Sequence, residues 1–289
     1  MDIAVQITLN AIIAGAIYSL ATLGFNLSYS TTRFFDLGYG AYAAAGAYAV
    51  LWFYKSIGLD IVSSIGLGIL VAGCIGFAIE KVVFRQLRRR KASRTVLLIA
   101  SLGVLTVIQA MLAILFTSQF QTLSKDIGST RTVGIFGGVM TETQLLILLS
   151  AIIVMLVLSF VMRTTMFGKA VRAIADDEEV AQIVGINSER IIGIVFFVSA
   201  CIAGLAGIVV GFDTGIQPTI GLSILLKGVI AAIIGGLGDV YGGVLGAFLL
   251  AFIENAAAWQ FAGEWKDAIA FLILIVFLLF RPYGIRGKK

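Results

Sequence analysis

Long apolar stretches separated by short polar segments make up most of this chain. An α-helix needs roughly 20 consecutive apolar residues to cross the hydrocarbon core of a bilayer, and a window of that length finds about nine candidate spans. The segments at 37–54 and 223–236 are short and rich in glycine, which is typical of tilted, broken or re-entrant spans. The pattern predicts an all-α, polytopic transmembrane helical bundle with spans at 5–28, 37–54, 61–84, 95–117, 143–163, 191–212, 223–236, 243–261 and 266–281.

Composition agrees with a membrane protein and argues against an enzyme. Apolar residues make up 60% of the chain and charged residues 13%, whereas soluble domains have roughly 45–50% and about 25%. The chain has no His, and it has neither a phosphate-binding loop nor a nucleophile motif. Its cysteines, Cys74 and Cys201, both lie in apolar spans, so we expect neither a disulfide nor a metal site. The whole chain, 1–289, is predicted to form one non-catalytic transmembrane domain.

Basic residues gather on one side of the predicted topology: in the loop at 85–94, around the polar stretch at 163–190 and at the carboxyl terminus. Because cytoplasmic loops carry an excess of Lys and Arg, these segments are predicted to be cytoplasmic. The amino terminus then lies outside the cytoplasmic (inner) membrane and the carboxyl terminus inside. We therefore attribute the net charge of +5 to topology and to contact with anionic lipid, and not to nucleic-acid binding.

The polar stretch at 168–187 predicts a short amphipathic helix that no membrane span requires. Asp176 is placed to cap its start, and Glu179, three residues later, is in the position that completes a capping box. Gly185 is placed to end it in a left-handed conformation. An interfacial helix lying on the membrane is the alternative, although three acidic residues in the first turn would face anionic lipid unfavourably. The apolar face of the helix is formed by Val180, Ile183 and Val184.

Small side chains recur every four residues in the span at 191–212, and the same spacing returns in the span at 243–261. A continuous stripe of small residues allows two helix backbones to approach closely. The predicted packing residues are Ser199, Ala203, Gly207 and Gly211 in the first of these spans and Gly242 and Gly246 in the second.

Ionisable residues within or beside the spans are candidates for function. Glu254 either faces a substrate path, where it could bind an ammonium group, or joins two helices by hydrogen bonds. Lys227 is four residues into its segment and is expected to extend to the membrane interface. Asp36 is expected to cap the second span or to belong to a site. Asp239 lies in a glycine-rich turn and is interpreted as a turn residue.

Several stretches of the chain resemble the permease subunits of branched-chain amino acid ABC transporters. The polar stretch at 168–187 is similar to their cytoplasmic coupling loop, and the residues at 199–207 are similar to the span that follows it. Where many members carry an Asn and then a His or Gln in the second span, this chain has Asp36 and Tyr39, which leaves the cargo open. The resemblance extends to the second span, the late glycine motif and the basic tail: 26–50, 235–247 and 281–285.

This resemblance implies the permease subunit of an ATP-driven importer of branched-chain or other neutral amino acids. It implies a second homologous permease, two cytoplasmic ATPases that bind ATP and Mg, and an extracytoplasmic substrate-binding protein. The loop at 118–142 and the turn at 213–221 are the two longest outer polar stretches of the charge-derived topology, so we expect them to receive the binding protein. No cofactor is expected in this chain. The alternatives are a sister permease for urea, amides, nucleosides or sugars, an ion-coupled secondary transporter, and a membrane assembly factor.

The resemblance implies an ATPase-coupling role for the polar stretch, and a separate physical argument predicts the translocation route. The ATPase-coupling set is Gly168, Arg172, Asp176, Glu179, Val180, Ala181, Ile183, Val184 and Gly185. The short second span and the acidic span are expected to line the translocation route, because short, interrupted segments are a usual sign of a midplane site. The residues predicted for this route are Asp36, Gly38, Tyr39, Gly40 and Glu254.

Overall fold

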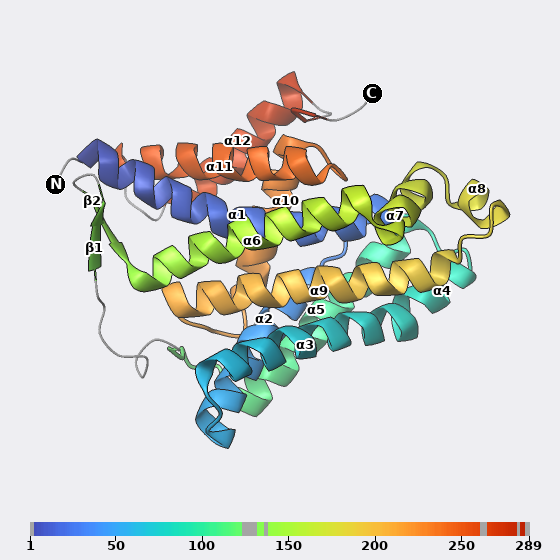
Figure 1. The fold of residues 1–289 in the computed structure, drawn as a ribbon, viewed down its shortest axis with the longest axis horizontal. Helices are drawn as coiled ribbons and strands as arrows, with labels where there is room; N and C mark the ends of the chain where they lie inside the picture. Colours follow the sequence, from blue (N-terminus) through green and yellow to red (C-terminus); the bar gives the residue numbers. More distant parts are fainter. Residues whose placement is uncertain (1–2, 123–131, 136–137, 261–264, 282–283, 287–289) are drawn as a thin grey trace.

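Helices make up almost all of the described chain, and the long helices α1, α3, α6, α9 and α11 run in roughly the same direction across Figure 1. The computed structural model describes residues 3–122, 132–135, 138–260, 265–281 and 284–286. In chain order the elements are α1 (Ile3–Thr32), α2 (Gly38–Trp52), the π-helical turn η1 (Phe53–Ile57), α3 (Ile61–Ile79), the π-helical turn η2 (Glu80–Phe84), α4 (Arg85–Arg89), α5 (Arg94–Phe116), β1 (Thr132–Ile135), β2 (Gly138–Thr141), α6 (Glu142–Thr164), α7 (Met166–Asp176), α8 (Glu178–Ile183), α9 (Ser188–Asp213), α10 (Ile220–Gly235), α11 (Val240–Gln260) and α12 (Lys266–Phe280).

Each predicted span corresponds to a helix, and the polytopic helical bundle is confirmed. Among the described residues, six helices are long and apolar enough to cross a membrane: α1, the continuous stretch Ile61–Arg89, α5, α6, α9 and α11. The helices α2, α10 and α12 are shorter, with 15, 16 and 15 residues. The second and seventh segments are therefore short continuous helices and are not broken, and α2 is prolonged by η1 until Gly58 ends it at φ 77°.

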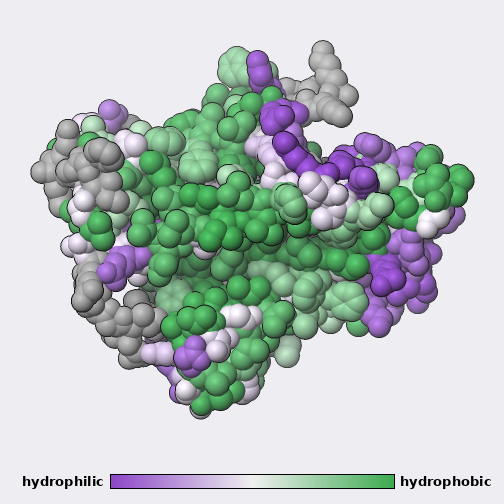
Figure 2. All heavy atoms as spheres, in the orientation of Figure 1, coloured by the Kyte–Doolittle hydropathy of each residue, from purple (hydrophilic) through white to green (hydrophobic). Residues whose placement is uncertain are grey.

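The helices α1, α2, α9 and α10 form the interior of the bundle. Nearly every side chain of α2 is buried, and α2 contacts α3, α5, α9 and α10. The helices α3, α5, α6 and α12 bury only a narrow stripe and turn large apolar side chains outward, as Ile114 of α5 does with 82% of its surface exposed. Figure 2 shows the resulting apolar surface along the middle of the molecule. Such a surface is stable in lipid and not in water.

The small-residue face of α9 packs against α1 and α2, as the sequence predicts. Ser199, Ala203, Gly207 and Gly211 are all buried. The Ser199 hydroxyl donates a hydrogen bond to the carbonyl of Gly24 in α1 at 2.6 Å. A Cβ added at Gly207 would lie 2.0 Å from the carbonyl oxygen of Ala43 in α2, so any larger residue forces the two helices apart.

The glycine spacing of α11 serves the same purpose against α10. A Cβ at Gly242 would lie 2.4 Å from the carbonyl oxygen of Gly235, and one at Gly246 would lie 2.2 Å from that of Ala231. The predicted packing role of Gly242 and Gly246 therefore agrees with their position. Close helix crossings of this kind explain the abundance of glycine, 33 residues in all.

The two ends of the bundle differ. The end that carries α4, α7 and α8 is called the α8 end, and the opposite end, with α1's first turn and the strands, is called the hairpin end (Figure 1). The strands β1 and β2 pair antiparallel with Thr132 opposite Thr141. Gln6 of α1 holds this hairpin by accepting a hydrogen bond from the Val139 amide at 2.9 Å and donating one to its carbonyl at 3.1 Å. Part of the loop predicted at 118–142 lies outside the described residues.

Candidate functional site: the α8 surface and the hairpin-end cavity

The polar stretch folds into two helices. α7 begins after Thr165, whose hydroxyl accepts the Gly168 amide at 3.1 Å, and it runs to Asp176. Asp177 is the residue that caps α8: its carboxylate accepts the amides of Glu179 at 2.9 Å and Val180 at 3.1 Å. The prediction that Asp176 is the cap is therefore wrong by one residue. Glu179 is the second residue of α8 and not the third, so no capping box forms with it.

The predicted left-handed stop at Gly185 is confirmed. Gly185 has φ 90°, its amide donates to the Gln182 carbonyl at 3.0 Å, and the Ile186 amide donates to the Ala181 carbonyl at 3.0 Å. These two bonds are the Schellman pattern, which satisfies the carbonyls left open at a helix end. α8 is thus capped at both ends by its own residues.

The apolar face of α8 points away from the protein. Val180, Ile183 and Val184 are 54%, 83% and 70% exposed. Ala181, on the opposite side, is 2% exposed and packs with Ile174 of α7 and other buried side chains beneath. α8 is therefore anchored by one face and presents three large apolar side chains on the other, which is the arrangement of a docking surface.

Gly168 and Arg172 shape the corner between α6 and α7. A Cβ at Gly168 would lie 2.3 Å from the Met162 carbonyl oxygen, so the corner requires glycine. Arg172 donates a hydrogen bond to the same carbonyl. Within the predicted coupling set, these two residues position α7, and the large exposed apolar side chains belong to α8 and its C-cap, Val184.

A group of ion pairs that sequence reasoning missed ties α4, the end of the continuous helical stretch Ile61–Arg89, to the start of α9. Glu189, in the first turn of α9, accepts from Arg89 Nε at 2.7 Å and also pairs with Arg85. Glu80 is only 2% exposed and pairs with Arg88. Glu80 near the end of an apolar span was the available signal, because ionisable residues in spans need partners.

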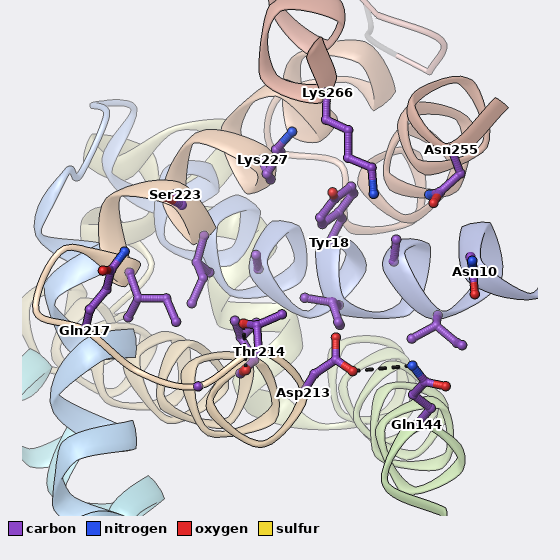
Figure 3. Close-up of a pocket in the computed structure, with 18 of the residues that line it drawn as sticks. Asn10, Tyr18, Gln144, Asp213, Thr214, Gln217, Ser223, Lys227, Asn255 and Lys266 are labelled. Atoms are coloured by element: carbon purple, nitrogen blue, oxygen red, sulfur yellow. Dashed lines mark hydrogen bonds between the residues drawn. The ribbon is translucent and has the colours of Figure 1, made fainter. Parts of the chain in front are cut away.

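A cavity of about 630 Å³ opens toward the hairpin end (Figure 3). Asp213, at the end of α9, lines one wall and accepts a hydrogen bond from Gln144 at 3.5 Å. Lys227 of α10 and Lys266 of α12 line the wall across from it, with Tyr18 of α1 between (Figure 3). The cavity thus presents a carboxylate and ammonium groups on different walls, and its size is within the range of small-molecule sites.

Glu254 and Lys227 form a buried ion pair beside this cavity. Lys227 Nζ lies 2.5 Å from Glu254 Oε1 and 2.9 Å from Asp267 Oδ1, and Tyr18 donates to Glu254 Oε2 at 2.7 Å. Glu254 is fully buried and Lys227 is 14% exposed. The sequence predicted that Lys227 extends to the membrane interface. The structure instead places its ammonium group in ion pairs with Glu254 and Asp267. Glu254 of α11 thus joins Tyr18 of α1 and Lys227 of α10, which agrees with the prediction that this carboxylate holds helices together.

The residues predicted to line the route are buried in helix packing. Asp36 is 2% exposed, and its carboxylate accepts the Gly38 amide at 2.9 Å at the start of α2. The residue in the N-cap position of α2 is Leu37, so Asp36 lies one residue before the cap that the sequence predicted. Tyr39 is 1% exposed, and a Cβ at Gly40 would lie 2.4 Å from the Gly221 carbonyl oxygen of α10. A route past these residues or past Glu254 would require the helices to separate, and their role in it stays a prediction.

Asp239 is a turn residue, as the sequence indicated. Its Oδ1 accepts the amides of Tyr241 at 2.9 Å and Gly242 at 3.2 Å, which holds the connection from α10 to α11. Its other oxygen lies 3.7 Å from Arg286 Nε. The turn therefore also fastens the carboxyl-terminal tail to the α8 end.

The fold defines a multi-pass helical membrane protein, with an exposed apolar surface on α8. The chain belongs to the family described as branched-chain amino acid transport system / permease component, which matches residues 7–278. It is 30% identical to the high-affinity branched-chain amino acid transport system permease protein BraD of Pseudomonas aeruginosa, over 98% of this chain and 95% of that protein. It is 29% identical to LivH of Escherichia coli, a permease of the same description, over 96% of this chain and 94% of LivH.

Two further similarities are more distant. The autoinducer 2 import system permease protein LsrC of Escherichia coli is 31% identical over 45% of this chain and 40% of its own length. The solved structure of PsaBC from Streptococcus pneumoniae in complex with Fab aligns with a TM-score of 0.54 at 13% identity, covering 99% of this chain and 94% of that one. At that identity the likeness concerns the fold alone.

Proposed function

We propose that this chain is the membrane subunit of an ATP-driven importer of branched-chain or other neutral amino acids. It acts with a second homologous permease, two ATPases that bind ATP and Mg, and an extracytoplasmic substrate-binding protein. The chain itself is not catalytic. The observation that carries the proposal is α8, a short helix capped by its own residues that turns Val180, Ile183 and Val184 outward. An ion-coupled transporter has no use for such a surface.

The orientation follows from charge. The basic stretch at 85–94, the polar helices α7 and α8 and the residues at 284–286 gather at the α8 end, which carries hydrophilic surface in Figure 2. The positive-inside rule then supports an α8 end in the cytoplasm, with the amino terminus outside an inner membrane and the carboxyl terminus inside. In this orientation the ATPases meet α8, and the substrate-binding protein meets the hairpin end.

The hairpin-end cavity supports amino acid cargo. Its opposed charges, Asp213 on one wall and Lys266 on another, complement the ammonium and carboxylate of a zwitterion. Glu254 is less suited to the cargo's ammonium, because its charge is already paired with Lys227. The partial similarity to LsrC supports a second candidate, import of another small solute by the same class of permease.

Purification of the tagged chain from its own membranes, followed by identification of the associated proteins, tests the class. We expect a second permease and ATPase subunits to co-purify in equal amounts, and we expect neither ATPase to be recovered with a chain that lacks α8. The proposal would be contradicted if the purified chain transported its substrate without any ATPase, driven by an ion gradient alone.

A further inference from the structure

A second cavity, of about 510 Å³, opens at the α8 end and is called the arginine cavity. Four arginines from distant parts of the chain line it: Arg33 after α1, Arg163 of α6, Arg172 of α7 and Arg286 of the tail. Figure 2 shows hydrophilic surface at this place, between the carboxyl-terminal part of the chain and the α7 end, bordering the apolar surface.

Three of these guanidinium groups bind neutral acceptors. Arg33 donates to the Ala175 carbonyl at 2.6 Å, Arg163 Nε donates to the Tyr241 hydroxyl at 2.6 Å, and Arg172 donates to a backbone carbonyl. Within the described residues, only Arg286 of the four pairs with a carboxylate. A guanidinium has five N–H donors, so each of the three retains donors that no carboxylate of the described chain occupies.

The charge around the cavity is unbalanced. Besides the four arginines, its lining contains two carboxylates, Asp176 and Asp239. Asp239 already accepts two backbone amides and pairs with Arg286. Counted over the described residues, the lining therefore has two positive charges in excess and favours an anion that accepts several hydrogen bonds, such as a phosphate group.

The remaining lining is apolar and includes Met162, Ile233 and Val240. These residues lie where α6 and α10 end and α11 begins, which is the level at which the apolar spans meet polar surface. Free phosphate would leave these side chains in water. A lipid could cover them with its glycerol and upper chain while its phosphate meets the arginines. Basic pockets between spans at this level suit anionic headgroups.

We propose that the arginine cavity binds the phosphate headgroup of an anionic lipid. The bound phosphate bridges α6, α7 and the tail and replaces the missing counter-charge of Arg33, Arg163 and Arg172. Because α7 leads directly into the cap of α8 at Asp177, the lipid also fixes the helix that presents the docking surface.

Lipid binding is measured on the full-length chain in detergent by native mass spectrometry, with phosphatidylglycerol, phosphatidylcholine and inorganic phosphate as probes. The test variant is Arg33→Gln/Arg163→Gln/Arg172→Gln. The matched control is Arg90→Gln/Lys91→Gln/Arg94→Gln, which removes the same charge from exposed residues outside the cavity. We expect the test variant to bind phosphatidylglycerol roughly 10- to 100-fold more weakly and the control to bind it like the wild type.

Three results would overturn the proposal. The first is that both variants bind phosphatidylglycerol equally weakly, and the second is that the wild type binds phosphatidylcholine as tightly as phosphatidylglycerol. The third is that inorganic phosphate displaces the bound lipid when both are present at equal concentration. The last would assign the site to a soluble phosphate. If the triple variant fails to fold, Arg163→Gln alone, with Arg90→Gln as its control, gives the same comparison. The assay needs no ATPase, so its outcome is independent of whether the chain imports amino acids.

Discussion

Replacing Ile183 by aspartate is expected to reduce substrate-stimulated ATP hydrolysis in the assembled importer to its basal level. Ile183 is 83% exposed and lies on the face of α8 that the ATPase is proposed to cover. A charged group in such an apolar contact loses its hydration without a partner, which costs about 2 kcal/mol or more. The measurement is the ATPase rate of the reconstituted complex with and without loaded binding protein, together with the amount of ATPase that stays bound.

The matched control is Gln182→Asp. It places the same charge on the same helix, one residue away and off the apolar face, so coupling should stay near that of the wild type. The isolated chain should unfold at nearly the same temperature in both variants, because Ile183 and Gln182 are both exposed and Gln182→Asp loses only a surface hydrogen bond to Glu178. Normal coupling in Ile183→Asp would exclude this face of α8 from the ATPase contact.

Replacing Glu254 by leucine is expected to destabilise the chain by about 3–5 kcal/mol, because it leaves a largely buried ammonium without its closest counter-charge. Lys227 keeps Asp267 at 2.9 Å, but Asp267 is 79% exposed and compensates less. Glu254→Gln retains hydrogen bonds to Tyr18 and Lys227 and should cost less. The double variant Glu254→Leu/Lys227→Met should recover most of the loss, since it removes both charges together. Thermal unfolding in detergent measures all three.

The same variants separate the two roles considered for Glu254. If the carboxylate only joins helices, uptake in Glu254→Gln should remain close to that of the wild type. A stable Glu254→Gln complex with normal basal ATP hydrolysis but little uptake would instead assign the charge to the cargo. Equal stability of the wild type and Glu254→Leu would contradict the importance of the ion pair itself.

Local features of the chain were predictable from sequence. The apolar spans, the small-residue face containing Gly207 and the left-handed stop at Gly185 each depend on residues close together in the chain. The cap of α8 was misplaced because Asp176 and Asp177 are adjacent and both suit a cap. Asp176 is not free to cap α8 because it is the last residue of α7. That helix begins after its N-cap Thr165, eleven residues earlier, and a short sequence window around Asp176 does not include that residue.

Features that depend on how distant helices cross were not predictable. Lys227 and Glu254 lie 27 residues apart, and they meet only because α10 and α11 pack through their glycines. The arginine cavity combines Arg33 with Arg286, whose nearness follows from the whole bundle. The charge count grouped these arginines on one side of the predicted topology, but it did not predict that they line one cavity.

Uptake of radiolabelled leucine tests the central claim most directly. The chain, with the permease and ATPases that co-purify with it, is reconstituted in proteoliposomes and supplied with its binding protein. We predict accumulation that requires ATP and Mg on the α8 side, that unlabelled branched-chain amino acids compete away, and that Ile183→Asp removes. Leucine uptake that proceeds without ATP, or that persists unchanged in Ile183→Asp, would contradict an importer driven through α8.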